Sequence, residues 1–418
     1  MRLSAEERDI AGGEHGEALA MPMRIVAEAG RLLGAKKLIA ISSAHIDGCL
    51  YHGDGGVEFA ERLAAAGARA AVPATLNVGA LDLVHAGRVH WDDHRHAMAG
   101  RLMAAYQAMG CAPTWTCAPY QAGHRPARGA QVAWGESNAV CFVNSVLGAR
   151  TNRYGDFLDI CCAVTGRAPL AGLHLDDNRR ATVVVDTARL SPALKDTDAF
   201  YPVLGAWLGA EVGSAVAVID GLPGALGEDR LKGLGAAAAS SGAVALFHVA
   251  GVTPEAPTVK AALGGQAPEK TLSPTAAVLR AVRDRLSTAA GPSGRIDAVA
   301  VGSPHFSLDE FAALEALAAG KRFRVPFYAC TSRANLAALE IEGRVAPLEA
   351  AGVEFVVDTC VVVAPILADG GGVLMTNSGK FAYYTPANTG YSVVYGSLAD
   401  CVASAVAGNV RRDETPWR

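Results

Sequence analysis

Three of the nine cysteines stand in surroundings that could bring a thiolate to a reactive site. Cys117 lies in the loop-like run Thr-Cys-Ala-Pro-Tyr at 116–120, Cys330 closes an apolar strand-like run, and Cys360 follows Val-Asp-Thr at 357–359. Residues at the carboxyl ends of strands in an α/β domain point into the crevice where binding sites form. Three such thiolates can hold an iron–sulfur cluster and leave one iron open to a substrate. The same three residues could instead be thiols packed in a core.

The other six cysteines show no spacing typical of metal ligands. The chain has nine cysteines in all, which is an odd number, they are spread through its length, and no Cys-x-x-Cys pair occurs. This pattern excludes a disulfide framework, a zinc ribbon and a thioredoxin-like motif. Cys161 and Cys162 fall in an apolar helical pattern at 157–164, where packing in a core is the expected role.

A second group of candidate residues is polar. Short polar side chains and glycines alternate at 134–138 and 144–152, which suits either a network of turns or the floor of a pocket. Ser332 and Arg333 follow a strand, so they could form a helix cap with a solvated arginine or a clamp for a carboxylate. Lys380 follows Asn-Ser-Gly and is either a lysine in a surface turn or a contact for an anion.

Common nucleotide-binding and hydrolase motifs are incomplete or missing in the sequence. The run at 233–238 fits a relaxed dinucleotide fingerprint, but no strand precedes it, and an Ala-rich helix is the better interpretation. Phe381 stands where a phosphate-binding loop needs Ser or Thr. The chain contains neither Gly-x-Ser-x-Gly nor His-Glu-x-x-His.

The elements that must position these residues alternate between helix and strand. Helical spacing runs over 6–33 and 56–66, and strand-like runs occupy 37–43 and 68–72. This alternation predicts an α/β fold with largely parallel sheets. Further strand candidates lie at 181–186, 215–219, 243–247, 298–301, 327–329, 355–358 and 372–375.

Length, composition and charge limit the possible classes of protein. At about 150 residues per domain, 418 residues predict two or three compact units. Hydrophobic residues at 51% against 19% charged residues exclude disorder, and a net charge of −4 without a basic stripe argues against a nucleic-acid partner. The start of the chain has no apolar secretory segment, and the Ala-rich stretch 235–252 is interrupted by polar residues. We therefore expect a cytoplasmic protein without a membrane span, in which 235–252 is a buried helix end running into a strand.

Six short motifs follow one another along the chain. They are Ser-Ala-His-Ile-Asp-Gly at 43–48, Gly-Glu-Ser-Asn-Ala-Val at 135–140, Gly-Ala-Arg-Thr-Asn at 148–152, Cys-Thr-Ser-Arg at 330–333, Asp-Thr-Cys at 358–360 and Asn-Ser-Gly-Lys at 377–380. This ordered set, over residues 1 to about 405, resembles the large (catalytic) subunit of the aconitase X family. The resemblance implies an aconitase-like multidomain α/β fold with helices on both faces of the sheets. The implied domains are 1–180, 181–290 and 291–418, the last carrying two cluster cysteines.

The resemblance also implies an iron–sulfur hydro-lyase acting on a small molecule. By motif position, Cys117, Cys330 and Cys360 would ligate a [2Fe-2S] or [4Fe-4S] cluster. Ser332 and Arg333 resemble the Ser-Arg element that binds a substrate carboxylate in aconitases. The family positions that line the substrate pocket correspond here to Gly48, Cys49, Asn77, Glu136, Ser137 and Lys380.

A small swivelling domain completes the active site in this family, either fused or as a separate subunit. The chain has no room for it after residue 391, so we expect a second polypeptide that contributes an active-site serine. The catalytic base is assigned first to that subunit, with Lys380 and Glu136 as candidates in this chain. Family members dehydrate either cis-3-hydroxy-L-proline or phosphomevalonate. The Ala- and Arg-rich composition is typical of GC-rich bacteria and favours the first substrate.

Two other classes of function stay open from the residues alone. The chain could be a non-catalytic binding module with structural cysteines. It could also be a metal-independent enzyme, such as a racemase with Cys117 and Cys330 as acid and base. Only the iron–sulfur hypothesis predicts a brown protein when the chain is purified without oxygen.

Overall fold

The computed structural model describes residues 1–289 and 294–418, which form two compact units. The N-terminal unit comprises Met1–Leu81 and Trp91–Arg180, and the C-terminal unit comprises Asp82–His90 and Ala181–Arg418. The predicted domain boundary at 290/291 lies outside the described residues, and the division into three domains stays a prediction. None of the helices in the described ranges combines the length and apolarity that crossing a membrane requires.

A small parallel sheet is the centre of the N-terminal unit. Strand β2 (Ala44–Ile46) pairs in parallel with β3 (Ala74–Leu76) on one side and with β4 (Ala133–Trp134) on the other. A separate antiparallel pair joins β1 (Leu38–Ala40) to β5 (Arg167–Pro169). The helices of this unit are α1 (Ala5–Gly12), α2 (Glu17–Leu32), α3 (Asp54–Ala65), α4 (Asp93–Ala108), α5 (Ser137–Phe142), α6 (Leu158–Thr165) and the short turns η1 (Pro119–Ala122), η2 (Val143–Leu147), η3 (Gly172–His174) and η4 (Asp176–Arg179).

Two predictions for the N-terminal unit need correction. The helical pattern at 6–33 is two helices, because Gly13 and Gly16 both take positive φ and break the chain between α1 and α2. The run at 68–72 is not a strand. Its backbone N–H groups at Ala70 and Ala71 donate to Met109 O and Ala163 O, at or near the ends of two helices, instead of to a neighbouring strand. The strand begins only after Pro73, as β3.

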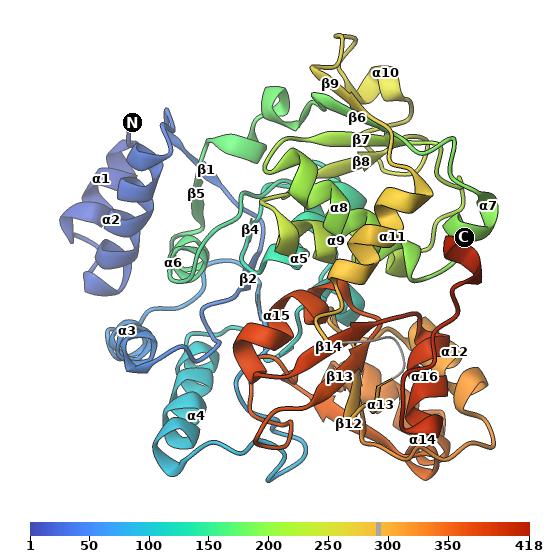
Figure 1. Ribbon diagram of the computed structural model, residues 1–418. Helices are drawn as coiled ribbons and strands as arrows, with labels where there is room; N and C mark the ends of the chain where they lie inside the picture. Colours follow the sequence, from blue (N-terminus) through green and yellow to red (C-terminus); the bar gives the residue numbers. More distant parts are fainter. Residues whose placement is uncertain (290–293) are drawn as a thin grey trace. The chain divides into compact units, whose positions relative to one another are not determined.

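Two parallel sheets form the C-terminal unit (Figure 1). One has the strand order β8-β7-β6-β9 and the other β12-β11-β10-β13-β14, and every pairing within them is parallel. The strands are β6 (Val183–Asp186), β7 (Ala217–Asp220), β8 (Phe247–Val249), β9 (Lys270–Leu272), β10 (Ala298–Val301), β11 (Phe327–Thr331), β12 (Val353–Val357), β13 (Val373–Thr376) and β14 (Ser392–Tyr395). The helices are α7 (Pro192–Lys195), α8 (Phe200–Val212), α9 (Glu228–Ser241), α10 (Val259–Ala262), α11 (Ala276–Arg285), α12 (Leu308–Ala318), α13 (Arg333–Ile341), α14 (Val345–Ala351), α15 (Gly379–Thr389), α16 (Leu398–Ala407) and η5 (Thr415–Trp417). The predicted α/β class with largely parallel sheets is confirmed.

Small residues allow α8 and α9 to pack at close range. A Cβ atom at Gly205 of α8 would lie 2.1 Å from Leu234 O of α9, so only glycine fits there. The Ala-rich stretch predicted as a helix end followed by a strand is confirmed, because α9 ends at Ser241 and β8 follows. The aromatic core of the unit lies instead around β10–β12, where Phe306, Phe311 and Phe355 pack together.

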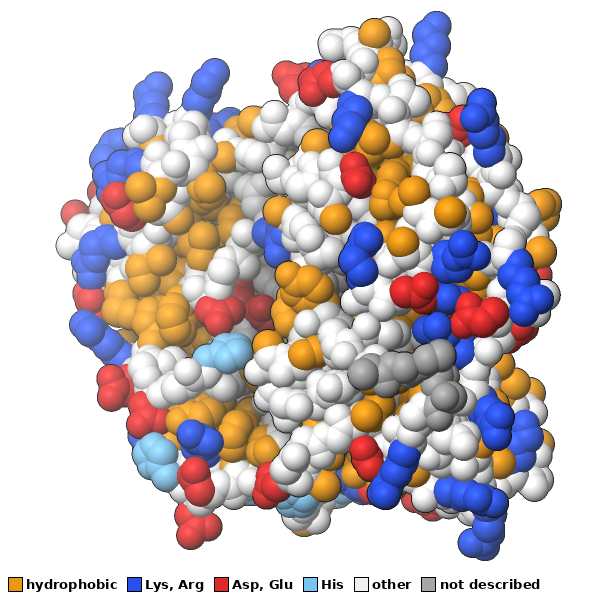
Figure 2. All heavy atoms as spheres, viewed as in Figure 1, with side chains coloured by type: hydrophobic (Ala, Val, Ile, Leu, Met, Phe, Trp, Pro, Cys, Tyr) orange, Lys and Arg blue, Asp and Glu red, His pale blue; other side chains and the backbone are white. Residues whose placement is uncertain are grey.

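Charged side chains of both signs are interspersed over the face of the molecule shown in Figure 2. The small net charge of −4 is therefore not gathered into a field of one sign on this face.

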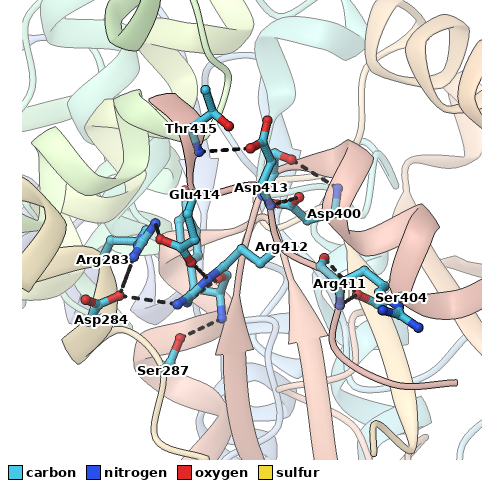
Figure 3. A network of polar contacts seen from close by, with 12 residues as sticks. Arg283, Asp284, Ser287, Asp400, Ser404, Arg411, Arg412, Asp413, Glu414 and Thr415 are labelled. Carbon is cyan, nitrogen blue, oxygen red and sulfur yellow. Dashed lines mark hydrogen bonds and ion pairs between the residues drawn. The ribbon is translucent and has the colours of Figure 1, made fainter. Parts of the chain in front are cut away.

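The C-terminal tail, residues 411–418, is fixed to the C-terminal unit by charged and capping contacts (Figure 3). Arg283 of α11 is buried, pairs with Glu414 at 2.7 Å and lies over the Trp417 ring. Arg411 N donates to Ser404 Oγ of α16 at 2.8 Å. The tail thus joins α11 to α16, two helices separated by more than a hundred residues of chain.

We expect Arg283→Met to release this tail while keeping the rest of the unit folded. Loss of the charged contacts should cost about 2 kcal/mol of unfolding free energy, because Glu414 regains solvent when its partner is removed. Limited trypsin digestion followed by mass spectrometry should show faster cleavage after Arg411 and Arg412. Arg295→Met is the control, since Arg295 is exposed and pairs with Asp297 at the surface. Equal cleavage rates in both variants would contradict the tail's dependence on Arg283.

Candidate active site

The predicted pocket residues of the N-terminal unit gather at one edge of its parallel sheet. Gly48 and Cys49 follow β2, Asn77 follows β3, and Glu136 and Ser137 follow β4. Carboxyl ends of parallel strands meet at the same edge, so turns from three distant segments converge there. Backbone bonds hold the turns in register, since Asn77 N donates to Ile46 O at 2.9 Å and Gly135 N donates to His45 O at 2.7 Å.

A buried carboxylate shapes the turn after β2. Asp159, in the first turn of α6, is fully buried, and its Oδ2 accepts from Asp47 N at 2.6 Å and from Gly48 N at 3.4 Å. The carboxylate of Asp47 in turn accepts a hydrogen bond from the Asn77 amide. Side chains therefore tie the turns after β2 and β3 together, and the turn after β4 is held by the backbone bond of Gly135.

These carboxylates share a strongly negative environment. Burial, together with the negative charges of Glu136, Asp156 and Asp159, raises the pKa of Asp47 to about 8. Burial also raises the pKa of Asp159 to about 7, although the N–H groups that it accepts oppose this shift. Near neutral pH, the pair therefore holds protons that isolated carboxyl groups would have released.

Cys117 is joined to the same edge of the sheet. The Asn138 amide donates to Cys117 O at 3.1 Å and also to the Glu136 carboxylate. Glu136 takes a positive φ of 62° and accepts from Ala139 N at 2.8 Å, which caps α5. The Cys49 thiol, by contrast, is fully buried and donates to Asn77 O at 3.3 Å, and burial raises its pKa well above the usual value.

The C-terminal unit brings together the other two predicted ligands. Cys330 lies in β11 opposite Val356 of the adjacent parallel strand β12, and Cys360 follows the end of β12 at Val357. Both thiols are buried, Cys330 completely and Cys360 with 6% exposure. The two cysteines thus lie at neighbouring strand ends, and their role as ligands stays a prediction.

Ser332 and Arg333 stand beside these cysteines at the start of α13. Ser332 Oγ accepts from Asn335 N at 3.2 Å and is the helix cap that the sequence left open. Arg333 holds the fully buried Asp358 with two bonds, Nε to Oδ1 at 2.8 Å and Nη2 to Oδ2 at 2.6 Å. Asp358 takes a φ of 63°, a left-handed conformation that turns the chain between β12 and Cys360. Arg333 keeps 38% of its side chain exposed, so its outer N–H groups can reach a ligand.

His305 connects the two cysteine-bearing strand ends. Phe306 N donates to Cys330 O at 3.0 Å, and His305 Nε2 donates to Thr359 O at 3.2 Å. Burial, together with the charges of Lys232 and Lys380, lowers the pKa of His305 to about 3, so the ring is neutral. Lys380 therefore lies close enough to His305 for its charge to act on the ring.

Gly302, just before His305, is expected to be irreplaceable. A Cβ there would lie 2.1 Å from Cys330 O, and its φ of 93° disfavours any side chain. Gly302→Ala should cost more than about 3 kcal/mol, because strain and overlap with backbone add. Gly251→Ala is the matched control, with a positive φ but open space around it, and should cost about 1 kcal/mol. Denaturant unfolding of both variants tests this, and equal losses would contradict the overlap.

The three predicted ligands, Cys117, Cys330 and Cys360, offer thiolate sulfur atoms, which bind soft metals. All nine cysteines are buried, and of the three predicted ligands Cys330 lies near the end of β11, Cys360 follows β12, and Cys117 lies in a loop bonded to Asn138 after β4. Cys117 belongs to the N-terminal unit, and Cys330 and Cys360 belong to the C-terminal unit. Within the described ranges, no three His, Cys, Asp or Glu side chains are arranged to hold a metal ion. Thiolates on turns of this kind fit an iron–sulfur cluster better than a hard cation.

Comparison with known proteins decides the family. Models of the aconitase X first, second and third domains match residues 1–177, 181–284 and 296–407. The chain belongs to the aconitase X family. A solved structure of Thermococcus kodakaraensis aconitase X (holo-form) superimposes on this aconitase X chain with a TM-score of 0.87 and 35% identity, covering 97% of this chain and 100% of that one.

Curated relatives fall into two groups. Cis-3-hydroxy-L-proline dehydratases from Pseudomonas aeruginosa and Hypocrea jecorina are 45% and 39% identical, over 100% and 98% of this chain and 72% and 69% of theirs. The phosphomevalonate dehydratase large subunit of Methanothermobacter thermautotrophicus is 38% identical over 94% of this chain and 96% of its own length. All are named dehydratases, so the predicted hydro-lyase class is confirmed.

Sequence reasoning missed four residues of this site. Asp159 carries a signal, because it is the one charged residue in the apolar run of α6. Asp47 and Asp358 lie inside motifs that were singled out, but their hydrogen-bond partners come from distant segments. His305 had no signal in the sequence. The site residues named from the sequence stay predictions, although each unit brings its own set together.

Proposed function

We propose that the chain is the large subunit of an iron–sulfur hydro-lyase that dehydrates cis-3-hydroxy-L-proline to Δ1-pyrroline-2-carboxylate. The observation that carries the proposal is the convergence of Gly48, Asn77 and Glu136 at one sheet edge, with Cys117 bound to the same turns. Identity of 45% to a dehydratase named for this substrate supports the choice of substrate. Phosphomevalonate is the alternative, supported by the 38% identical large subunit.

A separate small subunit is part of the proposal. The chain matches 96% of a protein named as a large subunit, and it matches only 72% of the longer Pseudomonas dehydratase. The name of the Methanothermobacter relative, a large subunit, implies that its enzyme also has a small subunit. We expect the large chain alone to be inactive, because the partner would supply the first-choice catalytic base.

Dehydration requires loss of the α-proton and departure of hydroxide. Cys117, Cys330 and Cys360 would hold the cluster, which, when bound, supplies a Lewis acid for the departing hydroxyl group. Arg333, oriented by Asp358, would bind the carboxylate and stabilise the negative charge that develops when the α-carbon loses its proton. Glu136 already accepts two N–H bonds at α5, so Lys380 is the better base within this chain.

Reconstitution tests the proposed function directly. The chain is purified without oxygen, alone and together with its candidate small subunit, and is assayed by mass spectrometry for loss of water from each of the two substrates. We expect a brown complex that converts cis-3-hydroxy-L-proline and a large chain that is inactive alone. Turnover of phosphomevalonate instead would establish the alternative. A colourless complex that turns over neither compound would reject the proposal.

A further inference from the structure

The acidic pocket of the N-terminal unit, defined as Asp47, Asp159 and Glu136 with Asp156 at its rim, has an unusual charge balance. The charges that act most strongly on Asp47 are those of the other three carboxylates. Neither Asp47 nor Asp159 forms an ion pair with a basic side chain in the part of the chain that the structure describes. Carboxylates placed together without a cation favour a ligand that brings positive charge.

Two polar atoms beside this pocket are buried without a hydrogen-bond partner. Asn77, only 2% exposed, donates its amide to Asp47 but leaves its Oδ1 unpaired. Tyr106 is fully buried, its Oη is unpaired, and it would lie 2.7 Å from a Cβ atom built on Gly48. An unpaired buried acceptor costs free energy until a donor reaches it. Asn77 Oδ1 accepts only, so it requires an N–H or O–H group from a ligand.

These observations specify the chemistry of the ligand. A protonated secondary amine carries one positive charge and two N–H donors, and the pocket offers a carboxylate and an amide oxygen to accept them. A phosphate has the wrong charge for this pocket, because it would be repelled by every carboxylate there. An acidic pocket of this kind would favour a substrate with an ammonium group over one with a phosphate group.

We propose that Asp47 and the Asn77 carbonyl oxygen bind the ring ammonium of a cyclic imino-acid substrate. This inference rests on the proposed function and assigns the residues that read the pyrrolidine nitrogen. Asp159 is a positioning residue, because its Oδ2 holds the Asp47 and Gly48 N–H groups and fixes the turn that carries the Asp47 carboxylate.

Binding at this site should release a proton. The pKa of about 8 means that Asp47 carries a proton at pH 7, while Asp159, Glu136 and Asp156 face it and Asn77 donates to it. When the ammonium arrives, the carboxyl O–H bond breaks, the proton goes to solvent and an ion pair takes its place. We expect release of about one proton per ammonium bound at pH 7 and tighter binding as the pH rises from 6 to 8.

The test compares two unreactive ligands of the reconstituted complex. L-proline has the ring ammonium and lacks the 3-hydroxyl group, and cyclopentanecarboxylate has the same ring size without nitrogen. Isothermal titration in buffers of different ionisation enthalpy gives both affinity and proton count. The wild-type complex should prefer L-proline by about 10- to 100-fold. Asp47→Asn should reduce this preference to within about threefold and abolish proton release.

Asp156→Asn is the matched control. Asp156 is exposed at the rim, so the substitution removes one negative charge there and leaves the bond between Asn77 and Asp47 in place. It should keep most of the preference for L-proline. An unchanged preference in Asp47→Asn, or equal proton release with cyclopentanecarboxylate, would overturn the inference. The proton count on the wild type needs no variant, so a folding defect leaves the test intact. A wild-type complex that prefers L-proline but does not dehydrate cis-3-hydroxy-L-proline would reject the proposed function and keep the ammonium site.

Discussion

Cys330→Ala is expected to abolish both iron binding and dehydratase activity in the two-subunit complex. The thiol is fully buried in β11 beside the turn that carries Cys360, and alanine removes a proposed sulfur ligand while keeping the strand. Loss of one ligand of three leaves the cluster without a stable attachment. Iron analysis and the visible absorption spectrum of protein purified without oxygen measure the effect independently of turnover.

Cys401→Ala provides the control for this experiment. Cys401 is also fully buried, lies in α16 and belongs to the hydrophobic core of the C-terminal unit. The variant loses the same atoms from the same unit and should keep its iron and its activity, with only a small loss of stability. If Cys330→Ala retained wild-type iron and activity, the cysteine assignment would be wrong. If both variants lost iron equally, general unfolding would be the cause.

Arg333→Lys is expected to reduce kcat/KM by about 100- to 1000-fold, with most of the loss in KM. Arg333 spans Asp358 with two parallel bonds and still presents N–H groups outward, which a lysine ammonium cannot do. A lysine would replace the two parallel bonds to the buried Asp358 with a single one, so the turn toward Cys360 should loosen as well. Steady-state kinetics together with iron content separates these two effects.

Arg344→Lys is the matched control for Arg333. Arg344 also pairs with carboxylates of the C-terminal unit, Glu315 and Glu342, but at the surface of helices away from the strand ends. The substitution should leave kinetics and iron content unchanged. Unaltered KM in Arg333→Lys would show that the arginine serves only to hold Asp358.

The parts of the site that are encoded locally were predictable from the sequence. Cys330 and Asn77 stand where apolar runs give way to polar residues, and such transitions mark the carboxyl ends of buried strands. Because parallel strands share an edge, residues from separate motifs could be expected to meet there. The family resemblance then supplied the roles that the pattern alone left open.

Interactions between distant segments explain what was missed. Asp159 accepts a hydrogen bond from Asp47 N, which lies 112 residues away in the sequence, and no local pattern in α6 indicates that partner. The contact between Arg333 and Asp358 was missed because the two residues come from different elements, and burial of that carboxylate requires a counter-charge. The run at 68–72 has the composition of a strand, yet the backbone bonds at Ala70 and Ala71 are made by a helix end and a helical residue elsewhere in the unit.

The segment 302–306, between β10 and α12, has a consequence for how this family can vary in length. It touches Cys330 through Phe306 and Thr359 through His305, and Gly302 leaves no free space against the strand. An inserted or deleted residue there would displace both thiols together. The exposed turn at 222–227 does not hold either cysteine-bearing strand end in place. Among homologues, we therefore expect gaps to cluster in surface turns of that kind and to be missing from the five residues after β10.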